Sequence, residues 1–142
     1  MTVTTFRYGN PARDCGRAQL RAHCRQLATV VTVTGAVDEA NADAIVEYAA
    51  HNILAEKPFV LDLSGVSCFS PQGISLLRAL SRECGATGVD WRLIAGDEVA
   101  RVLVAYAAAD IPTAESVPDA LAEFAEFNRS RRRLLPILTK TA

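Results

Sequence analysis

The chain has 142 residues, of which half are hydrophobic and 22% are charged. This length suits one domain with an ordinary hydrophobic core, and the composition excludes a disordered chain, a collagen-like chain and a disulfide scaffold. Uninterrupted apolar runs fall far short of the roughly 20 residues that cross a bilayer, and the first residues lack the apolar stretch of a signal peptide. We therefore expect a cytoplasmic protein without a membrane span.

The net charge of −1 hides an uneven distribution along the chain. Residues 1–27 carry +4 and residues 128–142 carry +5, whereas residues 28–127 carry −10. We expect no direct nucleic-acid binding, because phosphates repel an acidic body and the tail with Arg131, Arg132 and Arg133 is typical of a solvated end. Residues 134–138 of that tail are apolar enough to dock on the body or on a partner.

The four cysteines are too scattered for a C-x-x-C redox motif or a zinc ribbon. Two of them lie on apolar faces, Cys24 on a strand and Cys84 at the end of a helical stripe, and we expect both to be buried in a reducing compartment. The sequence predicts no metal site and no cofactor. Apart from Cys24 and Cys84, the cysteine and histidine side chains that could ligate a metal are Cys15, Cys68, His23 and His51, which are also widely separated in the sequence.

Hydrophobic periodicity predicts the first elements. Residues 18–25 alternate between apolar and polar, and the β-branched residues 29–34 end at Gly35, so a short connection between them predicts an antiparallel pair of strands. Apolar residues at helical spacing then predict an amphipathic helix over 42–53 that ends near Ala55.

The same analysis continues through the second half. Residues 58–63 are nearly all apolar, as in a central strand covered on both faces, and a helix follows from Ser70 to Gly85. Residues 91–96 form a short strand, and 99–107 have helical spacing.

The last elements complete the order. Residues 111–114 are extended, and Ser116 and Asp119, with Pro118 between them, resemble a capping signal for a final helix. The order β-β-α-β-α-β-α-β-α predicts an α/β fold: one domain over 17–127 with a mixed β-sheet flanked by about four helices. Residues 1–16 then form an N-terminal extension and 128–142 a basic and apolar tail.

The junction between the central strand and the second helix carries unusual residues. Ser70 can cap the helix with its hydroxyl, and Pro71 suits the first helical position. Gly73 is about 1 kcal/mol worse than a good helix former in a first turn, which suggests close approach by another backbone or a partner. The alternative is that these residues merely start a helix.

These motifs resemble the STAS domain family, in particular the bacterial anti-sigma factor antagonists. The resemblance covers about residues 17–127: residues 33–38 are similar to the family's G-x-L-D turn and residues 61–66 to its D-L-S-x-V strand. Gly73 with the leucine-rich helix, and residues 111–122, continue it. The resemblance implies a mixed sheet flanked by helices and a protein that docks an anti-sigma factor, commonly one with serine kinase activity.

One motif departs from the family. The helix start normally reads D-S-S-G, with the first serine as the phosphorylation site, and ungapped counting from Asp62 places Ser70-Pro71-Gln72-Gly73 there. Pro71 has no hydroxyl, so the usual switch cannot operate at that position. Ser70, one residue before the family's acceptor position, carries the nearest hydroxyl. We predict that it is not phosphorylated, because the following proline restricts its backbone.

The leading hypothesis is a non-enzymatic regulatory module that binds a protein partner. Its surface would comprise the turn over 35–38 and the start of the second helix, with Asp38 and Ser70 as polar contacts, Pro71 and Gln72 shaping the edge, and Gly73 permitting approach.

Three alternatives stay open. The chain could be a STAS subunit of a stress-signalling or transporter-associated complex, a small-molecule or nucleotide binder, or an enzyme that uses Cys68 or Ser70, although the usual catalytic signatures are absent. The sequence leaves open the sigma factor pathway, the mode of regulation and the oligomeric state, a homodimer included.

Overall fold

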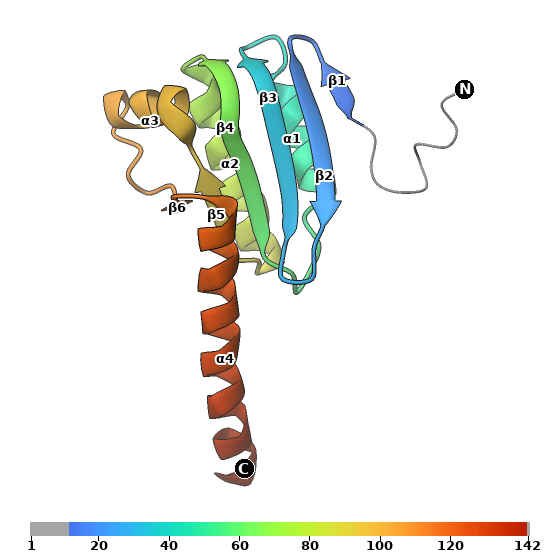
Figure 1. Ribbon diagram of the computed structural model, residues 1–142, viewed down its shortest axis with the longest axis vertical. Coiled ribbons are helices and arrows are strands. Elements are labelled where there is room, and N and C mark those ends of the chain that lie inside the picture. The colour runs from blue at the N-terminus through green and yellow to red at the C-terminus, as the bar shows by residue number, and fades with distance from the viewer. Residues whose placement is uncertain (1–11, 142) are drawn as a thin grey trace, which may run out of the picture.

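A computed structural model describes residues 12–141, with side chains from residue 12 to residue 129. These described residues fold into a six-stranded sheet and four helices (Figure 1). The strands, in chain order, are β1 Arg13–Cys15, β2 Ala18–Cys24, β3 Thr29–Val37, β4 Phe59–Phe69, β5 Trp91–Ile94 and β6 Thr113–Ala114. The helices are α1 Ala42–His51, α2 Gln72–Thr87, α3 Gly96–Ala105 and α4 Val117–Thr141.

The strands lie in the sheet in the order in which they occur in the chain. The first three are antiparallel, and β3 to β6 are parallel, joined in turn by α1, α2 and α3. The predicted α/β class and the predicted order of elements are therefore confirmed, with β1 added at the edge of the sheet within the segment that the sequence assigned to an extension.

Each face of the sheet has its own core. Because side chains alternate along a strand, Phe59, Leu61 and Leu63 of β4 pack toward α1 and α2, whereas Val60 points to the other face. There it meets Phe124 of α4. The central strand is covered on both sides, as its continuous apolar run predicts.

Two strands are longer than expected. The sequence predicts a strand over residues 29–34 that stops at Gly35 and a strand over residues 58–63. Both ends are wrong, because β3 continues to Val37 and β4 to Phe69. Parallel pairing of β3 with β4 continues to Val37 and Phe69, with register shifts between Thr32 and Thr34 and between Gly35 and Ala36.

The ends of the two longest helices also differ from expectation. Gly85 does not end α2, which continues to Thr87 and is capped by Gly88 in the left-handed region at φ +74°. The last helix continues past residue 127, where we expected a tail to begin, and extends to Thr141, so that it projects beyond the sheet (Figure 1). Across residues 12–141, no helix combines the length and the apolarity needed to cross a membrane.

The cysteines divide into buried and exposed pairs. Cys15 and Cys84 are buried, and burial raises the pKa of the Cys84 thiol to about 12. Cys24 is exposed, contrary to expectation, because the inward and outward alternation of β2 fails at its last residue. Its Sγ accepts a hydrogen bond from Lys57 Nζ at 3.0 Å, which lowers the pKa of the Cys24 thiol below 9.0.

We expect Cys24 to react with a maleimide near neutral pH much faster than Cys15 and Cys84, since the thiolate is the nucleophile. Lys57→Ala should slow labelling of Cys24 but not of the exposed Cys68, which serves as the internal reference. The difference in Cys24 labelling rate between the unmodified chain and Lys57→Ala should vanish at a pH above the pKa of the Cys24 thiol in both proteins. Peptide mapping by mass spectrometry measures the ratio, and an unchanged ratio in Lys57→Ala would contradict the role of the ammonium.

Candidate docking surface

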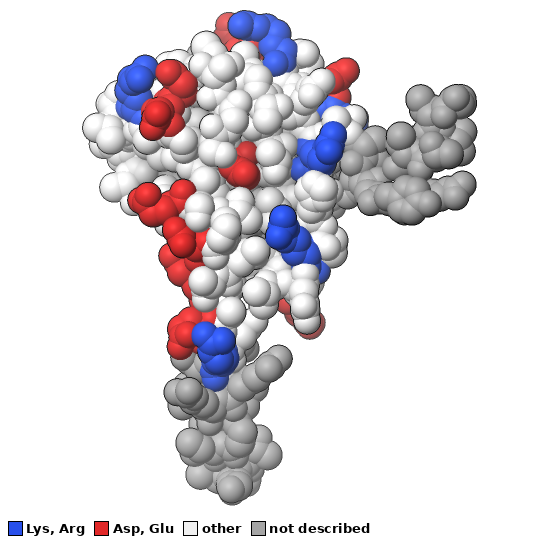
Figure 2. All heavy atoms as spheres, viewed as in Figure 1, with Lys and Arg blue, Asp and Glu red and all other residues white. Residues whose placement is uncertain are grey.

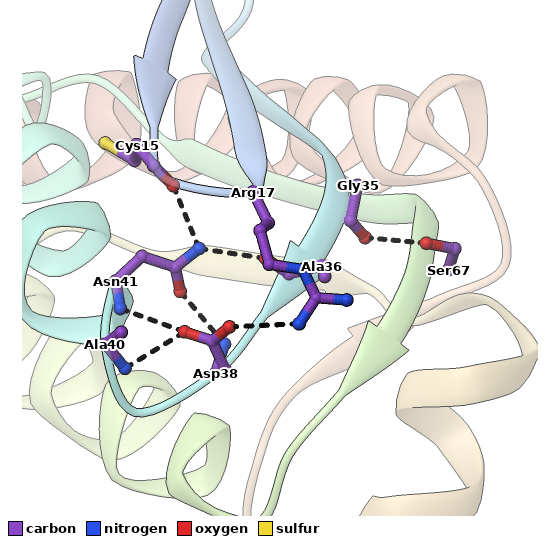
Figure 3. Close-up of polar contacts among 8 residues, drawn as sticks. All are labelled: Cys15, Arg17, Gly35, Ala36, Asp38, Ala40, Asn41 and Ser67. Carbon is purple, nitrogen blue, oxygen red and sulfur yellow. Dashed lines mark hydrogen bonds and ion pairs between the residues drawn. The ribbon is translucent and has the colours of Figure 1, made fainter.

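The ends of β3 and β4 bring together the two segments that the sequence singles out. The backbone N–H of Ser70 donates to the carbonyl of Val37 at 3.0 Å, and Ser67 Oγ donates to the carbonyl of Gly35 at 3.2 Å (Figure 3). We call residues 35–41 together with residues 67–73 the docking edge. Asp38 and Ser70 therefore lie at one end of the sheet.

Asn41 organises the first segment from a buried position, with only 4% of the residue exposed. Its Nδ2 donates to the carbonyls of Cys15 and Ala36, both at 2.9 Å, and its Oδ1 accepts from the N–H of Asp38 at 2.9 Å (Figure 3). One side chain thus satisfies polar groups from β1, β3 and the turn after β3, which fixes the position of this turn relative to the sheet.

Asp38 is used mainly to shape its own turn. Its Oδ1 accepts the N–H groups of Ala40 at 2.9 Å and Asn41 at 3.1 Å, in the manner of an Asx turn. Its Oδ2 lies 3.6 Å from a guanidinium nitrogen of Arg17, whose side chain is 72% exposed (Figure 3). The carboxylate that we expected to contact a partner therefore already has three intramolecular neighbours.

Gly35 is required by the close approach of β3 to the turn between β1 and β2. Its φ is +95°, and a Cβ at this position would lie 2.4 Å from the carbonyl oxygen of Arg17. The next residue, Ala36, donates its N–H to that same oxygen at 3.1 Å. A side chain at position 35 would separate β3 from the turn after β1.

The start of α2 is not capped by a hydroxyl. The N-cap is Pro71, without a side-chain capping bond, so the expectation that Ser70 caps this helix is wrong. Ser70 Oγ is buried and has no hydrogen-bond partner among the described residues. Backbone bonds start the helix instead, from Gly73 N–H to Ser70 and from Ile74 N–H to Pro71. Pro71 and Gln72 are exposed.

Gly73 has an intramolecular explanation. It is buried, and a Cβ there would lie 2.2 Å from Cζ of Phe69, whose ring is 6% exposed. The aromatic ring that ends β4 occupies the space where a side chain of the first turn would stand. The close approach inferred from the sequence is thus made by a ring of the same chain.

Sequence reasoning missed Asn41, Ser67 and Phe69. An asparagine just before the apolar helix is a signal for a helix N-cap. That signal would still have given the wrong partners, since Asn41 makes no capping bond in α1 and reaches Cys15, 26 residues away. Nothing local marks Phe69 as the neighbour of Gly73.

The sequential sheet, the crossover helices and the junction of the β3 turn with the start of α2 define an α/β domain of the STAS fold. The model of the STAS domain family matches residues 19–120. The chain belongs to the STAS domain family, which confirms the resemblance drawn from its motifs.

Three comparisons place the chain among known proteins. Osmosensory protein A of Mycobacterium tuberculosis H37Rv is 42% identical over 147 aligned positions, covering 99% of this chain and 92% of that protein. An anti-sigma factor antagonist from Mycobacterium paratuberculosis has a TM-score of 0.68 at 21% identity, covering 76% of this chain and 94% of that one. The anti-sigma factor antagonist SpoIIAA, in its unphosphorylated form, has a TM-score of 0.61 at 13% identity, with 75% and 96% covered. At these identities the two solved structures show a shared fold.

Proposed function

We propose that this chain is a non-enzymatic regulatory module that docks an anti-sigma factor through the docking edge. Membership of the STAS family and the shared fold with two anti-sigma factor antagonists support this class of function. The proposal locates recognition at the exposed residues of the edge, which include Ala40, Pro71 and Gln72.

The hydrogen bond from Ser70 N–H to the carbonyl of Val37 carries the proposal. It joins the last residue of β3 to the segment just before α2, so two segments more than thirty residues apart form one continuous edge. The contacts of Asn41 and Asp38 hold the backbone of that edge before any partner arrives. A surface organised in advance loses less conformational entropy on binding.

The same edge bears on regulation. By the resemblance, the acceptor position of the family is occupied here by Pro71, which has no hydroxyl, and the hydroxyl oxygen of Ser70 is buried. A kinase would have to open the start of α2 to reach it. We propose that docking does not depend on phosphorylation at this position. Treatment with kinase and ATP therefore leaves the affinity for the anti-sigma factor unchanged.

A matched pair of variants tests the docking edge against an anti-sigma factor of the serine kinase class from the same genome. Ala40→Arg with Gln72→Arg adds two bulky cations to the edge, and we expect the affinity measured by calorimetry to fall at least tenfold, about 1.4 kcal/mol. Ala86→Arg with Gln26→Arg makes the same chemical changes at exposed positions at the other end of α2 and of the sheet.

The control variant should bind as the unmodified chain does. Equal affinities for both variants would remove the docking edge as the binding surface. Failure of the unmodified chain to bind any anti-sigma factor of that genome would overturn the proposed function itself.

A further inference from the structure

The end of the sheet opposite the docking edge carries an exposed thiol. Cys24 is the last residue of β2, whereas Ala18, the first residue of the same strand, pairs with Gly35 of the docking edge. The Cys24 side chain is exposed, and its Sγ accepts a hydrogen bond from Lys57 Nζ at 3.0 Å. A thiol and an ammonium therefore lie in direct contact at the surface of the molecule.

The loop before β4 places Lys57 at this sulfur. The N–H of Thr29, the first residue of β3, donates to the carbonyl of Pro58 at 2.9 Å, which joins the loop to the end of the β2–β3 hairpin. Glu56 has a φ of +67°, in the left-handed region that residues other than glycine rarely adopt. The ammonium and the sulfur therefore meet through the fold, although 33 residues separate them in the chain.

A buried hydroxyl completes the group. Thr29 lies directly opposite Cys24 in the pairing of β2 with β3, so the two side chains project from the same face of the sheet. Thr29 is only 3% exposed, and its Oγ1 has no hydrogen-bond partner among the described residues. A buried hydroxyl without a partner is uncommon in a folded protein. This hydroxyl is therefore a donor that remains available to a group held at the sulfur.

Both neighbours favour the thiolate. The hydrogen bond from Lys57 is the main cause of the lowered pKa of the Cys24 thiol, and the nearby hydroxyl of Thr29 adds to it. The rest of the molecule opposes them, because residues 28–127 carry a net charge of −10. On the face drawn in Figure 2, acidic and basic side chains are interspersed and form no broad basic field. The stabilisation of the thiolate is therefore local to this group.

We propose that Cys24 is a site of oxidation by hydrogen peroxide, with Lys57 and Thr29 as positioning residues. An electron pair of the thiolate sulfur forms a bond to one peroxide oxygen, and the O–O bond breaks. The second oxygen leaves as hydroxide, which the solvent protonates to water. The sulfur loses two electrons, the peroxide gains them, and the product is a sulfenic acid. The Lys57 ammonium and the Thr29 hydroxyl donate hydrogen bonds to the oxygen that the sulfur has gained.

Labelling of the full chain during exposure to hydrogen peroxide at neutral pH tests the proposal. Dimedone traps sulfenic acids, and peptide mapping by mass spectrometry gives the rate at each cysteine. Cys24 should be labelled about tenfold faster than the exposed Cys68 of the same chain. Lys57→Ala should slow the labelling of Cys24 about fivefold, and Lys57→Arg, which keeps a cation at the sulfur, should restore most of the rate.

Thr29→Val tests the hydroxyl separately, because it removes the oxygen and keeps the shape of the side chain. It should slow the labelling of Cys24 about twofold without lowering the urea midpoint of unfolding, since the hydroxyl has no partner to lose. Arg25→Ala is the matched control, because it removes an exposed cation next to Cys24 that forms no hydrogen bond with the sulfur. This variant should be labelled as fast as the unmodified chain.

Equal labelling of Cys24 and Cys68 in the unmodified chain would overturn the proposal. An unchanged rate in Lys57→Ala, or a rate in Lys57→Arg no higher than in Lys57→Ala, would overturn it as well. An unchanged rate in Thr29→Val would overturn the role of the hydroxyl. No partner protein takes part in these measurements, so this proposal and the proposed function fail separately.

Discussion

We expect Gly73→Ala to lower the free energy of unfolding by about 1–3 kcal/mol, the usual cost of an overpacked core, and Gly73→Gln to lower it further. The added Cβ would overlap the buried ring of Phe69, at 2.2 Å from Cζ, and a ring packed between β4 and α2 cannot move as a flexible side chain does. Urea unfolding monitored by circular dichroism gives the difference.

The same helix provides a matched control. A Cβ at Gly85 would point into open space, so Gly85→Ala should raise the free energy of unfolding by about 0.5–1 kcal/mol through helix propensity. Phe69→Leu should reduce the penalty of Gly73→Ala in a double-mutant cycle, since the smaller side chain vacates the overlap. Equal effects at positions 73 and 85 would rule out steric overlap as the reason for the glycine.

The second large effect is expected at Asn41. Asn41→Ala should lower the free energy of unfolding by about 2–4 kcal/mol, because it leaves the carbonyls of Cys15 and Ala36 and the N–H of Asp38 without their buried partner. Asn41→Asp should be worse at neutral pH, since a carboxylate would face two carbonyl oxygens and could donate to neither.

The pH dependence of Asn41→Asp has a definite sign. Burial and the two carbonyls raise the folded-state pKa of the new carboxyl above its unfolded value of about 3.9. Its deficit should therefore be smallest below that value and grow as the pH rises through the folded-state pKa. Denaturant midpoints at pH 4 and pH 7 measure it. Asn52→Asp is the control, because the Asn52 side chain donates one hydrogen bond, to the carbonyl of Tyr48 at the end of α1. A loss of stability in Asn41→Asp that does not depend on pH would contradict the argument.

Sequence patterns correctly predicted the elements that bury one face, because burial of one face sets the spacing of the apolar residues. The alternation of β2 and the helical spacing of α1 to α3 report which side chains reach the core, and the core confirms them. The extension of β4 past Leu63 had no such signal, because Ser64 and Gly65 interrupt the apolar run while their backbone groups still pair with β3.

The sequence could predict which two segments of the candidate site lie together, but not the contacts that their residues make. The order of motifs brought the turn around Asp38 and the start of α2 together, which the bond between Ser70 and Val37 achieves. The roles of Gly73 and Asn41 depend on Phe69 and Cys15, which contact them only through the fold. A helix glycine and a pre-helix asparagine have several local explanations, and only tertiary packing selects one.

The sheet ends in very short strands on both sides, three residues in β1 and two in β6. An edge strand exposes unpaired N–H and C=O groups that can template the addition of another strand, and short edges leave little room for it. Among the described residues, the two outermost strands are therefore poor templates for edge-to-edge aggregation and for a peptide that binds by β-strand addition. The proposed docking edge consists instead of a turn and a helix start, whose exposed side chains can be exchanged without disturbing the pairing of the sheet.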